Sequence, residues 1–149
     1  MRCPGYSELV SEAETPEFQV ALETFNAQPF TGLMSASLME FGDGVAIIEV
    51  PHRPELLQQH GFLHGGVIAY AIDNAITFAA GTVLGTSILT AGISIVYLRP
   101  AGSSITAIAT VVGSTRRQAV VNCEVHSTND HGKDVLVATG QGTATLVDR

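Results

Sequence analysis

Two adjacent glycines and an aspartate in one apolar segment are the residues best suited to chemistry. Gly65 and Gly66 open a run rich in Ala, Val and Ile, and Asp73 lies in its middle. Backbone N–H groups at a helix N-terminus carry partial positive charge and stabilise a developing oxyanion. A carboxylate can activate water or attack a carbonyl carbon. The segment therefore predicts a reaction site with the chemistry of hydrolysis.

The spacing within this segment requires a second subunit. The alanine-rich pattern predicts a helix from Gly65 to about Ala80, with Gly81 and Gly85 ending it. Asp73 then lies eight residues beyond Gly65, which is about 12 Å along the helix axis. Because the two residues cannot meet within one chain, we expect two such helices to pack antiparallel across a two-fold axis. Each site would combine Gly65 of one subunit with Asp73 of the other.

Simpler interpretations of the same residues stay open. A pair of glycines before a helix is commonly a turn device. Asp73 could be a buried acid whose oxygens are satisfied by backbone or by Thr77, one turn later. His64 is expected to position the loop through a hydrogen bond rather than to act as the general base.

Length and composition restrict the class of protein. The 149 residues suit a single domain, 1–149, with an N-terminal helical segment over 1–28. Hydrophobic residues make up 46% and charged residues 14%, and the formal charge of −7 excludes a nucleic-acid binder with a basic surface. The N-terminus lacks the apolar core of a signal peptide. No apolar span reaches about eighteen residues without a polar interruption, so the sequence predicts no membrane helix. We expect a cytoplasmic location.

The cysteines and histidines do not form metal-binding motifs. Cys3 and Cys123 are isolated and are expected to be inert thiols. None of the histidines forms a helical i, i+4 pair with a nearby acidic ligand. They are His52, His60, His64, His126 and His131. We expect no metal site.

The order of predicted elements gives the fold class. Thr15 and Pro16 begin a short helix, two strands follow over 33–41 and 45–50, and the segment from Pro51 to Leu63 is irregular. After the central helix, four strands are predicted over 88–98, 104–113, 118–128 and 134–147. This order predicts an α+β fold in which an antiparallel sheet wraps around one long central helix.

Alternation within the last two strands assigns the face that meets the core. Ala119, Val121, Cys123 and Val125 share one face of their strand. In the final strand the residues from Leu136 to Leu146 at every second position align on one side, and they include Gly140 and Gly142. Glycines on that face predict close approach of the alanine-rich helix.

The motifs in this order resemble a known family. The chain has His64-Gly65-Gly66 at the start of the central helix, Asp73 inside it, and Tyr97-Leu98-Arg99-Pro100-Ala101 after the next strand. This arrangement resembles the hotdog-fold acyl-CoA thioesterases, in particular the group typified by the phenylacetate-degradation thioesterase. The resemblance covers roughly Pro29 to Val147.

The resemblance implies roles for particular residues. It selects the N–H of Gly65, with Gly66 beside it, as the oxyanion donor, and Asp73 of the partner subunit as nucleophile or general base. The family's Asn-x-x-Gly-x-x-His-Gly-Gly pattern is altered here, because Gln58 stands at the Asn position. Thr90 matches a position where some relatives have a hydroxyl near the acid.

The resemblance also implies the substrate and the assembly. It predicts hydrolysis of an acyl-CoA by a homodimer or a dimer of dimers, that is, a homotetramer, without a cofactor. Arg116 and Arg117 could bind the phosphates of coenzyme A or form a solvated surface turn. His64 would lie near the substrate, and Phe62, Tyr70 and Phe78 could line an acyl pocket or belong to the core. The alternative function is a non-catalytic acyl-CoA-binding module.

Overall fold

The structure is a computed structural model and describes residues 15–148; Cys3 lies outside these residues. Within them the elements follow in one order along the chain. They are α2 (Pro16–Asn26), α3 (Pro29–Met34), β1 (Ser37–Gly42), β2 (Val45–Val50), the 3-10 helix η1 (Pro54–Leu56), α4 (Gly65–Leu84), β3 (Ile88–Tyr97), β4 (Ile105–Ser114), β5 (Gln118–Thr128) and β6 (Asp134–Leu146).

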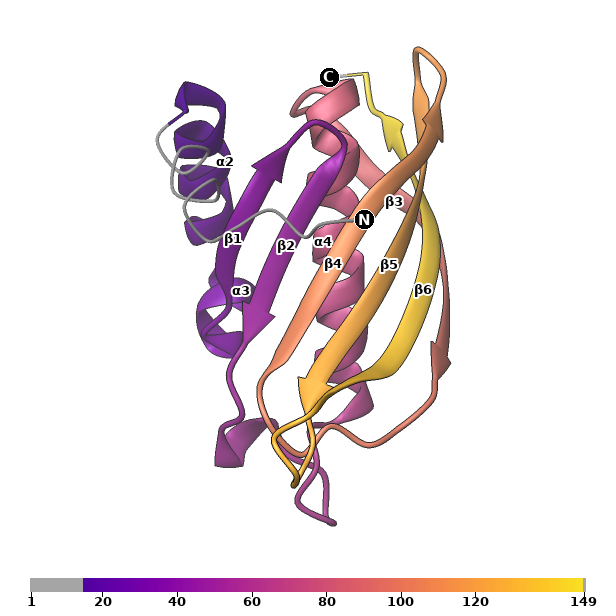
Figure 1. The fold of residues 1–149 in the computed structure, drawn as a ribbon. Coiled ribbons are helices and arrows are strands. Elements are labelled where there is room, and N and C mark those ends of the chain that lie inside the picture. The colour runs from indigo at the N-terminus through magenta and orange to yellow at the C-terminus, as the bar shows by residue number, and fades with distance from the viewer. Residues whose placement is uncertain (1–14, 149) are drawn as a thin grey trace.

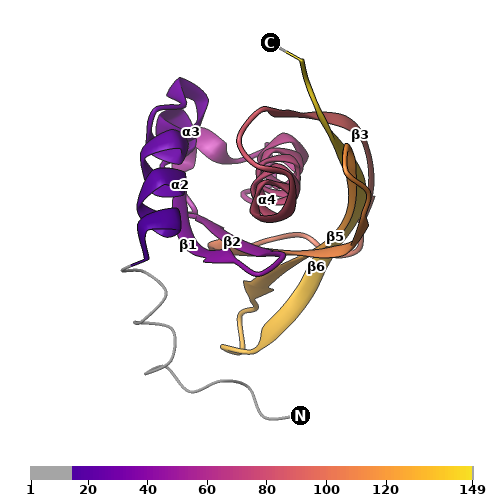
Figure 2. The same cartoon turned by 90° about the horizontal axis from the view of Figure 1, so that it is seen from above.

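The strands form one antiparallel sheet that curls around α4. Their order in the six-stranded sheet is β1-β2-β4-β5-β6-β3, so β1 and β3 are the edge strands. Figure 1 shows α4 running along the concave side of the sheet. In Figure 2 the sheet encloses α4 on two sides, and α2 and α3 cover a third. The predicted α+β class, with a sheet wrapped around a central helix, is confirmed.

Helix α4 is the core of the fold. It is long and apolar enough, by length and composition alone, to cross a membrane. Here its apolar side chains are buried against the sheet, with Ile72, Ala75 and Ile76 fully covered. The helix continues through Gly81 to Leu84 and ends at Gly85, whose φ of 88° suits glycine. The prediction that Gly81 helps to end the helix is therefore wrong.

Two glycines of β6 let α4 approach the sheet closely, as their spacing predicted. A Cβ added at Gly140 would lie 2.6 Å from Cγ2 of Ile72, and one added at Gly142 would lie 3.2 Å from Cδ1 of Ile76. The 2.6 Å distance is shorter than real Cβ contacts, so a larger residue at Gly140 would push Ile72 and the helix away. At Gly142 the contact with Ile76 is tight, and the added Cβ would also lie 2.8 Å from the Gly92 carbonyl oxygen of β3. These contacts fix the height of the middle of α4 above the sheet.

A buried polar cluster ties α2 and α3 to α4. The Asn74 amide nitrogen donates to Oε1 of Gln28 at 2.9 Å and to the Tyr70 hydroxyl at 3.1 Å. Thr31 shares a hydrogen bond of 2.6 Å with the same hydroxyl. Burial raises the pKa of the Tyr70 hydroxyl, although its hydrogen bonds with Thr31 and Asn74 act to lower it. Tyr70 thus serves the helix packing in this chain.

Two local predictions are wrong. Leu33 to Ala36 do not belong to a strand, because Pro29 occupies the first turn of helix α3 and Ser35 ends that helix with a φ of 51°. The segment from Pro51 to Leu63 is irregular as predicted, apart from the single helical turn η1. Strand β6 has a β-bulge between the residue that pairs with Val125 and the residue that pairs with His126. As a result Val137 is fully buried, whereas Leu136, which was predicted to face the core, is not.

The alternation predicted for β5 is confirmed. It buries Cys123, and this burial makes the stability of the fold depend on pH. Cys123 is a free, buried thiol, and burial, together with the neighbouring Glu124 carboxylate, raises its pKa from 9.0 to about 12. The folded state thus retains a proton that the unfolded state loses above pH 9.0. Stability is expected to fall as pH rises through this window, by up to about 1.4 kcal/mol per pH unit. Urea unfolding between pH 8 and about 11 measures this slope.

The matched variant for this prediction is Cys123→Ala. It removes the titrating group and should show a smaller alkaline slope than the unchanged chain, even though the lost packing lowers its stability at pH 8. Equal slopes in the two proteins would contradict the prediction.

Candidate active site

The first turn of α4 leaves one backbone donor unpaired. His64 caps the helix: its Nδ1 accepts from the Gly66 N–H at 2.8 Å, and its carbonyl accepts from Val67 at 2.9 Å and from Ile68 at 3.4 Å. Among the described residues no group accepts from the Gly65 N–H. Gly65 therefore offers the donor at the positive end of a 20-residue helix, whereas the Gly66 N–H is already used.

Tyr97 holds the carbonyl of the peptide between Gly65 and Gly66, whose N–H donates to His64. Its hydroxyl donates to the Gly65 carbonyl at 2.9 Å, and a Cβ at Gly65 would lie 3.4 Å from the ring. His64 and Tyr97 thus fix the Gly65–Gly66 peptide at its N–H and at its C=O. No local pattern in the sequence indicates this contact between β3 and the start of α4, so the role of Tyr97 was not predictable from the sequence.

We expect Tyr97→Phe to lower the turnover number. The variant keeps the ring against Gly65 and removes the hydrogen bond that holds the Gly65–Gly66 peptide, which adjoins the peptide carrying the Gly65 N–H. A hydrogen bond of this kind contributes about 0.5–1.5 kcal/mol, so a loss of roughly three- to tenfold in kcat is expected, with a smaller change in KM. Steady-state kinetics measures both. An unchanged kcat would show that the peptide is held without Tyr97.

Asp73 lies at the centre of α4, half-buried and in contact with β3. Thr90 donates to its Oδ1 at 2.6 Å. Thr77 contacts the Thr90 hydroxyl at 2.8 Å and donates to the Asp73 carbonyl at 3.0 Å. Because the Thr90 proton is directed to the carboxylate, the single Thr77 proton is shared between the Asp73 carbonyl and the Thr90 oxygen. Within residues 15–148 the second carboxylate oxygen, Oδ2, has no protein partner.

The structure does not bring Asp73 and Gly65 together in one chain. Both belong to the same continuous helix, and eight residues separate them, which is about 12 Å along the axis. No contact between the two is present in the described part of the chain. A site that uses both must therefore draw them from two subunits.

Gln58 and the arginines lie away from Asp73. The Gln58 side-chain oxygen accepts from the His60 N–H and so shapes the loop before α4. Arg117 pairs with Asp148 at 3.2 Å on the surface. The turn with Arg116 and Arg117 lies beside the end of β6, at the C-terminal end of α4 (Figure 1). Within one chain the arginines are thus at the opposite end from Gly65.

The comparisons with known proteins decide the family. The model of the thioesterase superfamily matches residues 60–133, the part of the chain that holds the start of α4, Asp73 and Thr90. The chain belongs to the thioesterase superfamily. No curated protein matches its sequence significantly.

Solved structures agree with this assignment. A thioesterase family protein from Silicibacter pomeroyi is 26% identical with a TM-score of 0.79, and the match covers 97% of this chain and 100% of that chain. A mutant of the phenylacetic acid degradation protein PaaI from Thermus thermophilus is 28% identical with a TM-score of 0.69, over 80% of this chain and 100% of that chain. The resemblance to PaaI-like thioesterases is confirmed.

A third structure agrees with the fold alone. The PaaI protein from the phenylacetic acid degradation operon of E. coli is 20% identical with a TM-score of 0.77, over 94% of this chain and 96% of that chain. At this identity the match supports the hotdog fold of the thioesterase and carries no residue roles.

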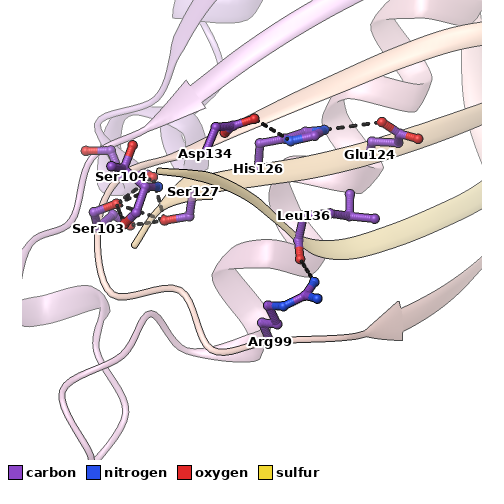
Figure 3. Close-up of polar contacts among 9 residues, drawn as sticks. Arg99, Ser103, Ser104, Glu124, His126, Ser127, Asp134 and Leu136 are labelled. Atoms are coloured by element: carbon purple, nitrogen blue, oxygen red, sulfur yellow. Dashed lines mark hydrogen bonds and ion pairs between the residues drawn. The ribbon is translucent and has the colours of Figure 1, made fainter. Parts of the chain in front are cut away.

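A second polar cluster lies at the end of the sheet where β5 ends and β6 begins (Figure 3). His126 sits between two carboxylates, 3.0 Å from Asp134 and 3.2 Å from Glu124. Ser103 and Ser127 form a separate pair at 2.9 Å. Both His126 nitrogens are occupied by carboxylates, so the histidine does not activate either serine. In the described part of the chain no group of three or more His, Cys, Asp or Glu could hold a metal ion.

Proposed function

We propose that the protein hydrolyses an acyl-CoA thioester to a carboxylic acid and coenzyme A, in sites shared between two subunits. Superfamily membership supports thioester hydrolysis as the general reaction. The observation that carries the finer proposal is the unpaired N–H of Gly65 at the start of α4. It is placed to donate to the oxygen that becomes negatively charged when a thioester carbonyl is attacked.

Asp73 of the second subunit supplies the other half of the chemistry. Thr90 fixes one carboxylate oxygen, which leaves Oδ2 to take a proton from water or to attack the carbonyl carbon. In the first route a C–O bond forms from water, the C–S bond breaks, and the proton passes to the sulfur of coenzyme A. In the second route Oδ2 forms a C–O bond with the carbonyl carbon, the C–S bond breaks, and coenzyme A leaves as a thiolate that takes a proton from solvent. Water then hydrolyses the resulting anhydride to the carboxylic acid and the free Asp73 carboxylate. Both routes yield the same products.

The edge strand β3 supports the pairing of two subunits. It pairs with β6 on one side, and its other edge is left without a partner strand in the sheet. Its exposed apolar side chains include Leu89 at 56%, Val96 at 60% and Tyr97 at 52% exposure. Such an apolar sheet edge readily pairs with a strand of another chain. We propose that a second copy pairs there, in a dimer or a dimer of dimers.

An antiparallel arrangement of two α4 helices would also move the arginines toward the site. Each chain has Arg116 and Arg117 near the C-terminal end of α4, whereas Gly65 is at the other end. Reversing the second subunit brings its arginines to the Gly65 end of the first. There they could meet the phosphates of coenzyme A, although Arg117 would first have to leave its exposed pair with Asp148.

Thiol release from a panel of acyl-CoA esters tests the proposed function. The panel includes short, long, branched and aromatic acyl groups, and light scattering on the same sample gives the oligomeric mass. Turnover by an oligomer is expected. Tight binding without turnover would favour the non-catalytic acyl-CoA-binding module. Full activity of a monomer would contradict the shared site.

A further inference from the structure

A pocket to which no role has yet been assigned lies beside the Asp73 cluster. It has a volume of about 480 Å³ and runs between α2, β1, the C-terminal half of α4 and the start of β3. This volume is in the range of pockets that bind small molecules. Figure 2 shows α2 alongside α4, where these walls face each other.

The walls of this groove are mostly apolar. They include Val20 and Ala21 from α2, Phe41 from β1, Phe78 from α4 and Ile88 from β3. Phe78 packs edge-to-face on Phe41, with ring centroids 6.3 Å apart. Of the aromatic residues considered for an acyl pocket from the sequence, Phe78 is in the groove wall, whereas Tyr70 and Phe62 are not among its lining residues.

Thr77 connects the groove to the candidate catalytic acid. It lines the groove, and its hydroxyl lies 2.8 Å from that of Thr90, which donates to Asp73. A thioester whose carbonyl carbon lies at Asp73 can therefore direct its acyl group past Thr77 into the groove of the same subunit. The coenzyme A portion would extend in the opposite direction, toward the other subunit.

We propose that this groove binds the acyl group of the substrate and selects apolar chains much longer than acetyl; this inference rests on the proposed function. Along α4 the groove extends from Thr77 to Gly85, which is about 12 Å of helix. Carbon–carbon bonds of about 1.5 Å advance an extended chain by roughly 1.3 Å each. About nine carbons beyond Thr77 fill that length, and the carbonyl carbon at Asp73 lies outside it. The chain of decanoyl-CoA therefore extends well past Thr77 into the groove, whereas that of acetyl-CoA does not reach it, which makes these two esters the probes.

Gly81 sets the free width of the groove. An added Cβ would meet Cδ1 of Ile88 at 3.8 Å and Cε2 of Phe41 at 3.9 Å. Both distances are ordinary contacts, and both partners belong to the groove wall. A side chain at this position therefore points into the groove without disturbing the backbone, and leucine favours a helix more than glycine does.

The test compares kcat/KM for decanoyl-CoA and acetyl-CoA in the unchanged chain and in Gly81→Leu. We expect Gly81→Leu to lower the decanoyl-to-acetyl ratio by about ten- to 100-fold, the usual range for lost apolar contact in a pocket. Val83→Phe is the matched control, because it adds four side-chain carbons on α4, as Gly81→Leu does, at a position that is 46% exposed and outside the groove. It should keep the ratio of the unchanged chain.

Val20→Phe provides a second variant from the opposite wall. Val20 is 53% exposed on α2, so its replacement narrows the groove without altering the core. An unchanged ratio in both groove variants would overturn the proposal and leave the thioesterase function intact. A change in oligomeric mass with an unchanged ratio would make the groove a subunit contact and would also overturn it. Absence of hydrolysis of every ester by the unchanged chain would instead overturn the proposed function.

Discussion

Replacing Asp73 by asparagine is expected to lower kcat for acyl-CoA hydrolysis by about 10²- to 10⁴-fold, the usual contribution of a general base. Asparagine has nearly the same shape and can still accept the hydrogen bond that Thr90 donates to Oδ1. It cannot take a proton from water, and it is a poor nucleophile. The folded structure should therefore persist while the chemical step is lost.

Two measurements separate chemistry from folding and binding. Thermal unfolding of Asp73→Asn should stay within a few degrees of the unchanged protein, and calorimetry should show that the variant still binds an acyl-CoA. Asp130→Asn is the matched control, since it removes one negative charge at an exposed residue of the turn between β5 and β6. Full activity of Asp73→Asn would show that Asp73 is only a structural acid satisfied by Thr90.

Replacing Gly65 by proline is expected to lower kcat by about 10²- to 10³-fold, the cost of removing one oxyanion donor. Proline has no N–H and is well tolerated in the first position of a helix. The preceding residue, His64, already has φ of −60° and ψ of 140°, a conformation that is compatible with a following proline. The substitution thus removes the donor from a backbone that can stay in place.

Gly65→Ala is the matched control for the proline variant. Both side chains place a Cβ about 3.4 Å from the Tyr97 ring, but alanine keeps the N–H. The proline variant should therefore lose much more activity than the alanine variant. Equal losses in the two proteins would assign the effect to crowding against Tyr97 and would contradict the role of the Gly65 N–H.

The sequence alone predicted the elements whose pattern is local. The small and apolar residues of α4, the alternation of β5 and the glycines of β6 each report which face meets the core, because near neighbours in sequence share one periodicity. Together they predicted the antiparallel sheet around a central helix. Local pattern failed at α3, where the six residues Pro29–Met34 form a helix too short for a periodic signal.

Only the tertiary structure decided which hydrogen-bonding groups at the site are left without a partner among the described residues. The sequence placed Gly65, Gly66 and Asp73 on one helix and predicted that two subunits must combine them. Only the folded chain shows that His64 occupies the Gly66 N–H, that Tyr97 holds the Gly65 carbonyl from 32 residues away, and that Thr90 binds Asp73 across 17 residues. These contacts depend on how the sheet curls around α4, and no spacing along the chain encodes that curvature.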